Sequence, residues 1–245
     1  MEYVDDDPEA GTRDLMDIFR NLIEPAKTLG TKDPRGVLER RGVLARPDFQ
    51  PITTHVTVRM PATKDAELPG EETLERIDRA LAVGADRSQR RLAILERLVP
   101  LAQDPSNLIL YFGPSVRDAE CMAYLLRERG IPAAVVSGAT REASRRRLID
   151  RFRRAELRVL CNCEVLATGF DAPRVTHVVM GRPTVSQVLY EQMIGRGLRG
   201  KRFGGREVCT ILDCEDDMKG PARPELGYKR CRRVWLKESE SAGRA

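Results

Sequence analysis

Two arginines stand three residues apart in the segment Q-M-I-G-R-G-L-R-G, residues 192–200, which also holds three glycines. The guanidinium groups of Arg196 and Arg199 can each donate two parallel hydrogen bonds, which suits a polyphosphate whose charge is spread over several oxygens. The apolar run before them predicts a helix that loosens at the glycines. A glycine-rich helix end with solvated arginines is the alternative, and this segment by itself does not exclude it.

A second segment with polar residues beside a glycine is L-A-T-G-F-D-A-P, residues 166–173. Thr168 offers a hydroxyl to a phosphate, Gly169 permits a close approach of the backbone, and Asp171 places a carboxylate next to them. An ordinary turn uses the same residue types, so both interpretations stay open at this point.

The elements that position both segments are alternating buried strands and amphipathic helices, which begin near Asn107. This alternation predicts an α/β fold, a three-layer, doubly wound and mainly parallel sheet with right-handed crossovers. Ligands bind such sheets beyond the carboxyl ends of the strands, so we expect both segments at that edge. The predicted strands cover residues 108–112, 133–136, 158–161, 176–180 and 208–212, and the predicted helices cover 116–129, 142–155 and 185–194.

Residues 1–100 have a different pattern, which predicts a helical segment with one short strand. The β-branched run 53–59 predicts an isolated strand bounded by Pro51 and Pro61. Residues 71–99 predict two helices. The chain is thus expected to consist of a segment over residues 1–100, an α/β domain over residues 101–218 and a basic C-terminal tail over residues 219–245.

Composition limits the partners that the protein can have. The 245 residues include 42 Lys and Arg against 37 Asp and Glu, a mildly basic net charge of +5. Aromatic residues make up only 5% of the chain, which argues against a protein that binds single strands by base stacking. The acidic N-terminus and the lack of a long apolar run predict a cytoplasmic protein without a membrane partner.

Cysteine and histidine usage argues against a metal site. The chain has six cysteines without a C-x-x-C pair, and its histidines are His55 and His177. We expect reduced, mostly buried thiols. His177 falls in a predicted strand, where a satisfied core residue is a better interpretation than a catalytic one.

Four motifs follow one another in this chain: I-L-Y-F-G-P-S at residues 109–115, V-S-G-A-T at residues 136–140, and the two segments described first. In this order, residues 107–217 closely resemble the second RecA-like lobe of superfamily-two helicases of the DEAD/DEAH-box, RadD-like and restriction-type group. The resemblance implies a helicase C-terminal RecA-like domain over residues 101–218, with ATP as the nucleotide and DNA or RNA as the track.

The resemblance also assigns roles to the arginine segment. Arg196 and Arg199 match the arginine fingers that reach the γ-phosphate of ATP bound to the first lobe, and Gln192 belongs to the same motif. Residues 19–47 resemble the helical connector that some of these helicases carry between their lobes. The arginine segment would therefore complete a catalytic site whose other half lies elsewhere.

The remaining motifs match nucleotide and nucleic-acid contacts. By the same resemblance, Gly169 and Asp171 would face the nucleotide, whereas Thr168 would contact the nucleic-acid backbone. The loops that follow the strands would line the nucleic-acid track through Gly113, Ser115, Ser137, Gly138 and Thr140.

One part of a complete motor is missing from this sequence. No G-x-x-x-x-G-K-[ST] occurs, so no loop of that type is present to cradle phosphates. Residues 213–216 imitate a D-E-x-D box, but they follow the arginine segment, and we interpret them as the end of a strand. ATP and Mg²⁺ would be bound mainly by a first RecA-like lobe, supplied in trans or lost by truncation. The chain alone is not expected to hydrolyse ATP.

A stand-alone nucleic-acid-binding or regulatory module without ATPase activity is the second hypothesis. Residues 141–158 hold eight arginines against three acids and could follow a phosphate backbone, with binding that weakens steeply as salt rises. A solvated helix face with ion pairs is the alternative for this stretch. The sequence leaves open whether the track is DNA or RNA and whether its strands are separated.

Overall fold

Strands and helices alternate along a computed structural model that describes residues 34–59, 88–163, 172–182, 184 and 186–219. Every strand and helix predicted after Asn107 is present. The elements are α3 (Pro34–Arg40), β1 (Arg46–Arg59), α5 (Ser88–Gln103), β2 (Ile109–Phe112), α6 (Val116–Arg127), β3 (Ala133–Val136), α7 (Glu142–Arg153), β4 (Val159–Asn162), β5 (His177–Met180), α8 (Gln187–Ile194), the 3₁₀ helix η2 (Lys201–Phe203) and β6 (Val208–Lys219).

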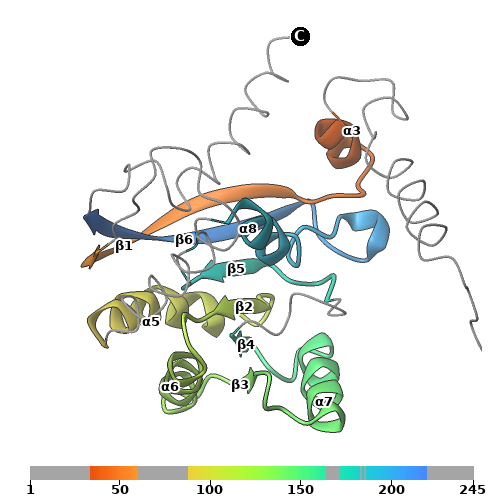
Figure 1. Cartoon of the computed structure of the whole chain (residues 1–245). Helices are drawn as coiled ribbons and strands as arrows, with labels where there is room; N and C mark the ends of the chain where they lie inside the picture. Colours follow the sequence, from red (N-terminus) through yellow and green to blue (C-terminus); the bar gives the residue numbers. More distant parts are fainter. Residues whose placement is uncertain (1–33, 60–87, 164–171, 183, 185, 220–245) are drawn as a thin grey trace, which may run out of the picture.

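The described strands form one parallel sheet in the order β1-β6-β5-β2-β4-β3 (Figure 1). β2 lies between β4 and β5, and all four of its residues are buried, which explains its apolar sequence. Strands that come later in the chain add on both sides of β2, as in a doubly wound fold. The predicted α/β class is confirmed, and every strand pair is parallel.

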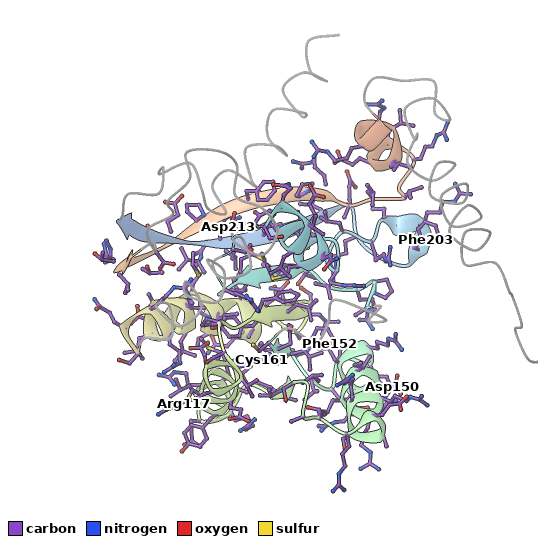
Figure 2. All side chains as sticks on the ribbon, in the orientation of Figure 1. Arg117, Asp150, Phe152, Cys161, Phe203 and Asp213 are labelled. Carbon is purple, nitrogen blue, oxygen red and sulfur yellow. The ribbon has the colours of Figure 1, made fainter. Side chains whose placement is uncertain are left out.

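Helices cover both faces of the sheet and give the domain three layers. On one face α5 and α6 pack against the strands through residues such as Leu98 and Met122. On the other face α7 and α8 pack through Phe152 and Tyr190, and Figure 2 labels Phe152 between α7 and the sheet. Full burial of an apolar side chain of this size contributes roughly 1.5–3 kcal/mol to stability.

β1 differs from the isolated strand predicted over residues 53–59. It pairs in parallel with β6 from Arg46 onward and forms one edge of the sheet. Pro51 lies inside the strand and does not bound it, which an edge strand tolerates because one side of its backbone needs no ladder. The pairing shifts register between Thr53 and Thr57, where His55 has a positive φ of 53°. The sequence pattern shows the strand but not its partner.

α5 crosses the domain boundary expected at residue 100. The helix continues to Gln103 and packs against both β1 and α6. It accounts for the second of the two helices predicted over residues 71–99, and the first lies outside the described residues. Both β1 and α5 therefore belong structurally to the sheet domain.

β6 is longer than the strand predicted over residues 208–212. It continues to Lys219 because β1 pairs along its length. Asp213 and Asp216 therefore lie within β6. The interpretation of residues 213–216 as the end of a strand is wrong, because β6 continues to Lys219. Both carboxylates are buried, and Tyr190 of α8 donates its hydroxyl to Asp213 at 2.9 Å (Figure 2).

A buried ion pair joins α5 to three strands. Arg90 is only 1% exposed, and its Nε donates to the Asp216 carboxylate at 2.8 and 3.0 Å. The hydroxyl of Thr54 on β1 donates to the same carboxylate, and Nη1 of Arg90 donates to the carbonyl oxygen of Gly181. This network fixes the backbone just beyond the carboxyl end of β5.

Candidate functional site

The loop after β2 is held tightly against the start of α6. Gly113 donates its N–H to the carbonyl oxygen of Asn162 at 2.8 Å. Ser115 caps α6, because its hydroxyl accepts from the N–H of Asp118 at 3.0 Å. A side chain at Gly113 would bring its Cβ to 3.2 Å from the Asp118 carboxylate. The predicted residues Gly113 and Ser115 thus lie at the carboxyl edge of the sheet in a loop with little freedom.

The Asp118 carboxylate connects the start of α6 to β2 and α5. It accepts hydrogen bonds from the hydroxyl of Tyr111 and from Nε of Arg91, the latter at 2.7 Å. Burial raises the pKa of Tyr111, and the neighbouring carboxylate raises it further, so the phenol stays protonated as a donor. Sequence reasoning did not single out this cluster, which positions the loop and is covered by it.

The loop after β3 forms a closed turn. The Ser137 N–H donates to the Thr140 hydroxyl at 2.9 Å, and the Thr140 N–H donates to the Ser137 carbonyl oxygen at 3.0 Å. Nη2 of Arg145 on α7 donates to the same carbonyl oxygen at 3.2 Å. Gly138 is exposed at the tip of the turn. The three predicted residues of this motif are therefore brought together.

Asn162 lies between these two loops and was not predicted as a site residue. It ends β4, level with Phe112 of β2 and Val136 of β3 in the sheet register. Its Nδ2 donates to the carbonyl oxygen of Tyr111, while its buried Oδ1 has no hydrogen-bond partner among the described residues. A polar residue at the end of the apolar strand V-L-C-N was the available signal.

The arginine segment follows α8, as predicted. The helix begins at the cap Ser186 and buries Tyr190, Met193 and Ile194, whereas Gln192 is exposed on its other side. The backbone then continues in a tighter turn, in which the N–H of Arg196 donates to the carbonyl oxygen of Met193. The arginine side chains thus come directly after a helix whose apolar face is fixed in the core.

This segment does not lie at the edge where we expected it. A Cβ at Gly197 would be 2.6 Å from both Cys209 Sγ and Val178 Cγ2, so the chain here passes very close to the first residues of β5 and β6. The expectation that both segments gather beyond the carboxyl ends of the strands is wrong for residues 192–200. The reason is that α8 returns antiparallel to the strands and ends at their amino ends.

Arg199 is exposed, and its backbone pairs with a segment far away in sequence. Leu44 and Arg199 form an isolated antiparallel bridge, and the Ala45 N–H donates to the Leu198 carbonyl oxygen at 3.1 Å. Arg196 is half-buried three residues earlier. The structure therefore places the two predicted arginines on one short, firmly held piece of chain.

The remaining predicted site residues, Thr168, Gly169 and Asp171, lie outside the described residues. Their segment starts after Cys163 and rejoins the described chain at Ala172, near the amino end of β5. Their roles stay predictions from the sequence.

The arginine-rich helix α7 is largely an ion-paired surface. Its partners are exposed, with Arg153 at 3.4 Å from Asp150 and Arg154 at 2.7 Å from Glu156. Such exposed pairs contribute about 0–1 kcal/mol each. Within the part of the chain that the structure describes, the exposed side chains of Arg141 and Arg147 form no ion pair. The helix face is thus solvated and partly ion-paired.

The described cysteines agree with their predicted structural role, whereas His177 is half-buried at the start of β5 and not in the core. Cys161, Cys163, Cys209 and Cys214 are buried thiols, and burial raises the pKa of Cys209 to about 12. The fifth, Cys121, is half-buried. Among the described residues no group of three potential metal ligands occurs, and no described helix is long and apolar enough to cross a membrane.

Comparison with known proteins gives a consistent class. Residues 90–201 match the family described as the helicase conserved C-terminal domain. The chain is 34% identical over 104 residues to IRC3 of Saccharomyces cerevisiae, a protein named as an ATP-dependent helicase; the match covers 42% of this chain and 15% of that protein. It is 41% identical over 99 residues to the mitochondrial protein irc3 of Schizosaccharomyces pombe, covering 40% of this chain and 16% of that protein.

Among solved structures, the C-terminal domain of the DEAD-box protein Dbp5 is similar with a TM-score of 0.45 and 22% identity, over 63% of this chain and 79% of that one. Residues 90–201 are therefore similar in sequence to a helicase C-terminal domain. The chain spans a small part of the length of the curated relatives that it matches.

Proposed function

We propose that this domain is the second motor lobe of an ATP-dependent helicase or translocase. In this function it supplies Arg196 and Arg199 to ATP bound on a P-loop lobe, and it guides nucleic acid over the loops that follow β2 and β3. The observation that carries the proposal is the match of residues 90–201 to the helicase C-terminal domain, within which the arginine segment is held rigidly at the end of α8.

The arginine segment fits a triphosphate by its chemistry. Arg199 is exposed, so its guanidinium can reach a group presented by another lobe, while Arg196 is half-buried beside it and Gln192 is exposed on the preceding turn. ATP bound on the other lobe supplies the phosphoryl group that is transferred to water. The arginines stabilise the negative charge that develops on that group. The described residues contain no carboxylate cluster for Mg²⁺, which we assign to the P-loop lobe.

The carboxyl edge fits a nucleic-acid backbone. Its loops offer hydroxyl groups and a glycine-tipped turn, which are common partners of phosphate and sugar and which do not read bases. Gly138 is exposed there, and Thr140 is half-buried beside it. Thr168 would add a further hydroxyl, by resemblance alone.

The test is nucleic-acid-stimulated ATP hydrolysis by this chain joined to, or mixed with, a P-loop lobe. Arg199→Ala and Arg196→Ala should each lower kcat by about 10³-fold or more, since an arginine finger contributes that much. Arg117→Ala on the exposed surface of α6 is the matched control and should leave kcat unchanged. Unchanged hydrolysis in both finger variants would contradict the assignment.

A nucleic-acid-binding module without ATPase activity is the second candidate, favoured by the exposed side chains of Arg141, just before α7, and Arg147 on it, which form no ion pair among the described residues. It predicts binding that weakens with salt, does not respond to ATP and is reduced in Arg141→Ala with Arg147→Ala. Hydrolysis that appears only when the P-loop lobe is present would set this candidate aside.

A further inference from the structure

Backbone hydrogen bonds join the segment Gly42–Ala45, which follows α3, to the residues around Arg199. The Gly200 N–H donates to the Val43 carbonyl oxygen at 3.0 Å, and the Arg202 N–H donates to the Gly42 carbonyl oxygen at 2.9 Å. Together with the Leu44–Arg199 bridge and the bond from Ala45 to Leu198, these contacts occupy the backbone on both sides of Arg199. We call the residues Gly42–Ala45 the clamp segment.

The fit between the clamp segment and the finger is too close for a side chain. A Cβ at Gly200 would lie 2.2 Å from the Gly42 carbonyl oxygen, which is backbone and cannot swing aside. On the other side, a Cβ at Gly205 would lie 1.8 Å from the Arg199 carbonyl oxygen, which accepts from the Arg206 N–H. Arg199 is therefore fixed between the clamp segment and the turn that follows η2.

The clamp segment is itself fixed to α3. Gly42 has a φ of +67° and donates its N–H to the Glu39 carbonyl oxygen at 2.9 Å, while the Val43 N–H donates to the Leu38 carbonyl oxygen at 2.9 Å. A residue with positive φ at this point is a common way to end a helix. Figure 1 shows α3 near the end of β1 at which the turn with η2 also lies. Backbone hydrogen bonds thus connect the end of α3 to the residues beside Arg199 through Gly42 and Val43.

We propose that the clamp segment is the positioning element for the Arg199 finger, so that the chain before β1 sets where the guanidinium is presented to the nucleotide. The inference rests on the proposed function, because it gives Arg199 its target. The hydrogen bonds from the clamp segment to residues 198–202 are formed by backbone atoms. The role of the clamp segment is to hold Arg199 within the narrow range of positions from which it can stabilise the transferred phosphoryl group.

The first experiment uses this chain alone and measures hydrogen exchange at the Gly200 amide. The bond to Val43 should protect this amide in the wild type. Gly42→Val should remove the protection, because a β-branched residue cannot adopt the positive φ that the turn requires. Gly42→Asn should retain it, because Asn tolerates that conformation. Equal protection in Gly42→Val and the wild type would overturn the proposal.

The second experiment measures ATP hydrolysis with the P-loop lobe present. Gly200→Ala and Gly42→Val should each lower kcat by about 100-fold, as expected when a catalytic group is misplaced by about 1 Å, with little change in the KM for ATP. Gly42→Asn should restore most of the rate. Gly130→Ala is the matched control, because Gly130 also has a positive φ, of 73°, but lies after α6. It should leave kcat unchanged.

Combination with Arg199→Ala separates positioning from general damage. If the clamp segment acts through Arg199, adding Gly200→Ala to Arg199→Ala causes no further loss of kcat. A fully additive loss would mean that the substitution damages the lobe in another way, and would overturn the proposal. If Arg199→Ala itself leaves kcat unchanged, the finger assignment fails. If Arg199→Ala lowers kcat while both glycine substitutions do not, only the clamp proposal fails.

Discussion

The two edges of the sheet carry functional residues by different means. At the carboxyl edge, loops continue directly from β2 and β3 and are held by side chains, such as the hydroxyls of Ser115 and Thr140. At the amino edge, the Arg199 segment is held by backbone contacts with residues far away in sequence. Side-chain hydrogen bonds therefore hold the loops at the carboxyl edge, whereas close backbone packing at glycines holds the Arg199 segment at the amino edge.

The difference follows from how each segment reaches its place. A loop that follows a strand is located by the end of that strand, so only its local conformation must be specified. The arginine segment returns along α8 to the opposite edge, where Gly197 packs against the core and Arg199 pairs with Leu44. The clamp segment supplies the pairing with Arg199.

The largest effect on stability is expected from the side-chain network of the carboxyl edge. Arg90→Met removes the buried cation that pairs with the Asp216 carboxylate and the donor to the Gly181 carbonyl oxygen. We expect a loss of about 3–5 kcal/mol in the free energy of unfolding, measured by urea denaturation. The double variant Arg90→Met with Asp216→Leu should recover part of the loss, because no unpaired charge stays buried.

Arg117→Met on the exposed surface of α6 is the control and should change stability by no more than about 0.5 kcal/mol. A loss as small as this in Arg90→Met would show that side chains do not hold the carboxyl edge.

A glycine from each edge gives a direct comparison of the two. Gly197→Ala at the amino edge places a Cβ 2.6 Å from Cys209 Sγ and Val178 Cγ2, so the core must shift, at a cost of about 1–3 kcal/mol. Gly113→Ala at the carboxyl edge places a Cβ 3.2 Å from the Asp118 carboxylate and 3.3 Å from the Ala119 backbone N, a milder crowding that needs shifts of only a few tenths of an ångström, and it should cost less than Gly197→Ala, about 1 kcal/mol. Thermal and urea unfolding of both variants check this. The reverse order would refute the assignment of tight backbone packing to the amino edge.

Much of the fold could be predicted because β2 to β5 are short apolar runs separated by amphipathic helices. The sequence of each run indicates both that it forms a strand and that the strand is buried. β1 and the second half of β6 could not be placed in the same way. β1 and the second half of β6 pair with each other at the edge of the sheet. Because β1 contains polar residues and two internal prolines, its pairing with β6 is visible only in the three-dimensional structure.

The sequence predicted the location of those candidate-site residues that directly follow a strand. Gly113, Ser115 and the turn at residues 137–140 lie where the sequence placed them. Arg199 was identified by residue type and spacing, but its location at the amino edge depends on the Leu44 bridge, which no local pattern reveals. Asn162 and Arg90 were missed because a single polar residue in an apolar context has no periodic signal.

The smallest expected effect is a pH dependence at the amino edge. His177 begins β5, and Thr176 Oγ1 lies 2.8 Å from its Nδ1. Burial lowers the pKa of His177 below its usual 6.5, and the positive charge of Arg206 lowers it further. The unfolded chain therefore binds a proton more readily than the folded one. The stability that this histidine contributes is fully present above pH 6.5 and is lost as the pH falls through the folded-state pKa.

Urea unfolding at about pH 7.5 and about pH 5.5 measures this effect as a difference between proteins. The wild type should lose more stability than His177→Gln over this range, because the variant has no group to protonate there. His55→Gln, which replaces an exposed histidine, is the matched control and should follow the wild type. If His177→Gln and the wild type lose equal stability, the pKa of His177 does not differ between the folded and the unfolded chain, which would contradict the prediction.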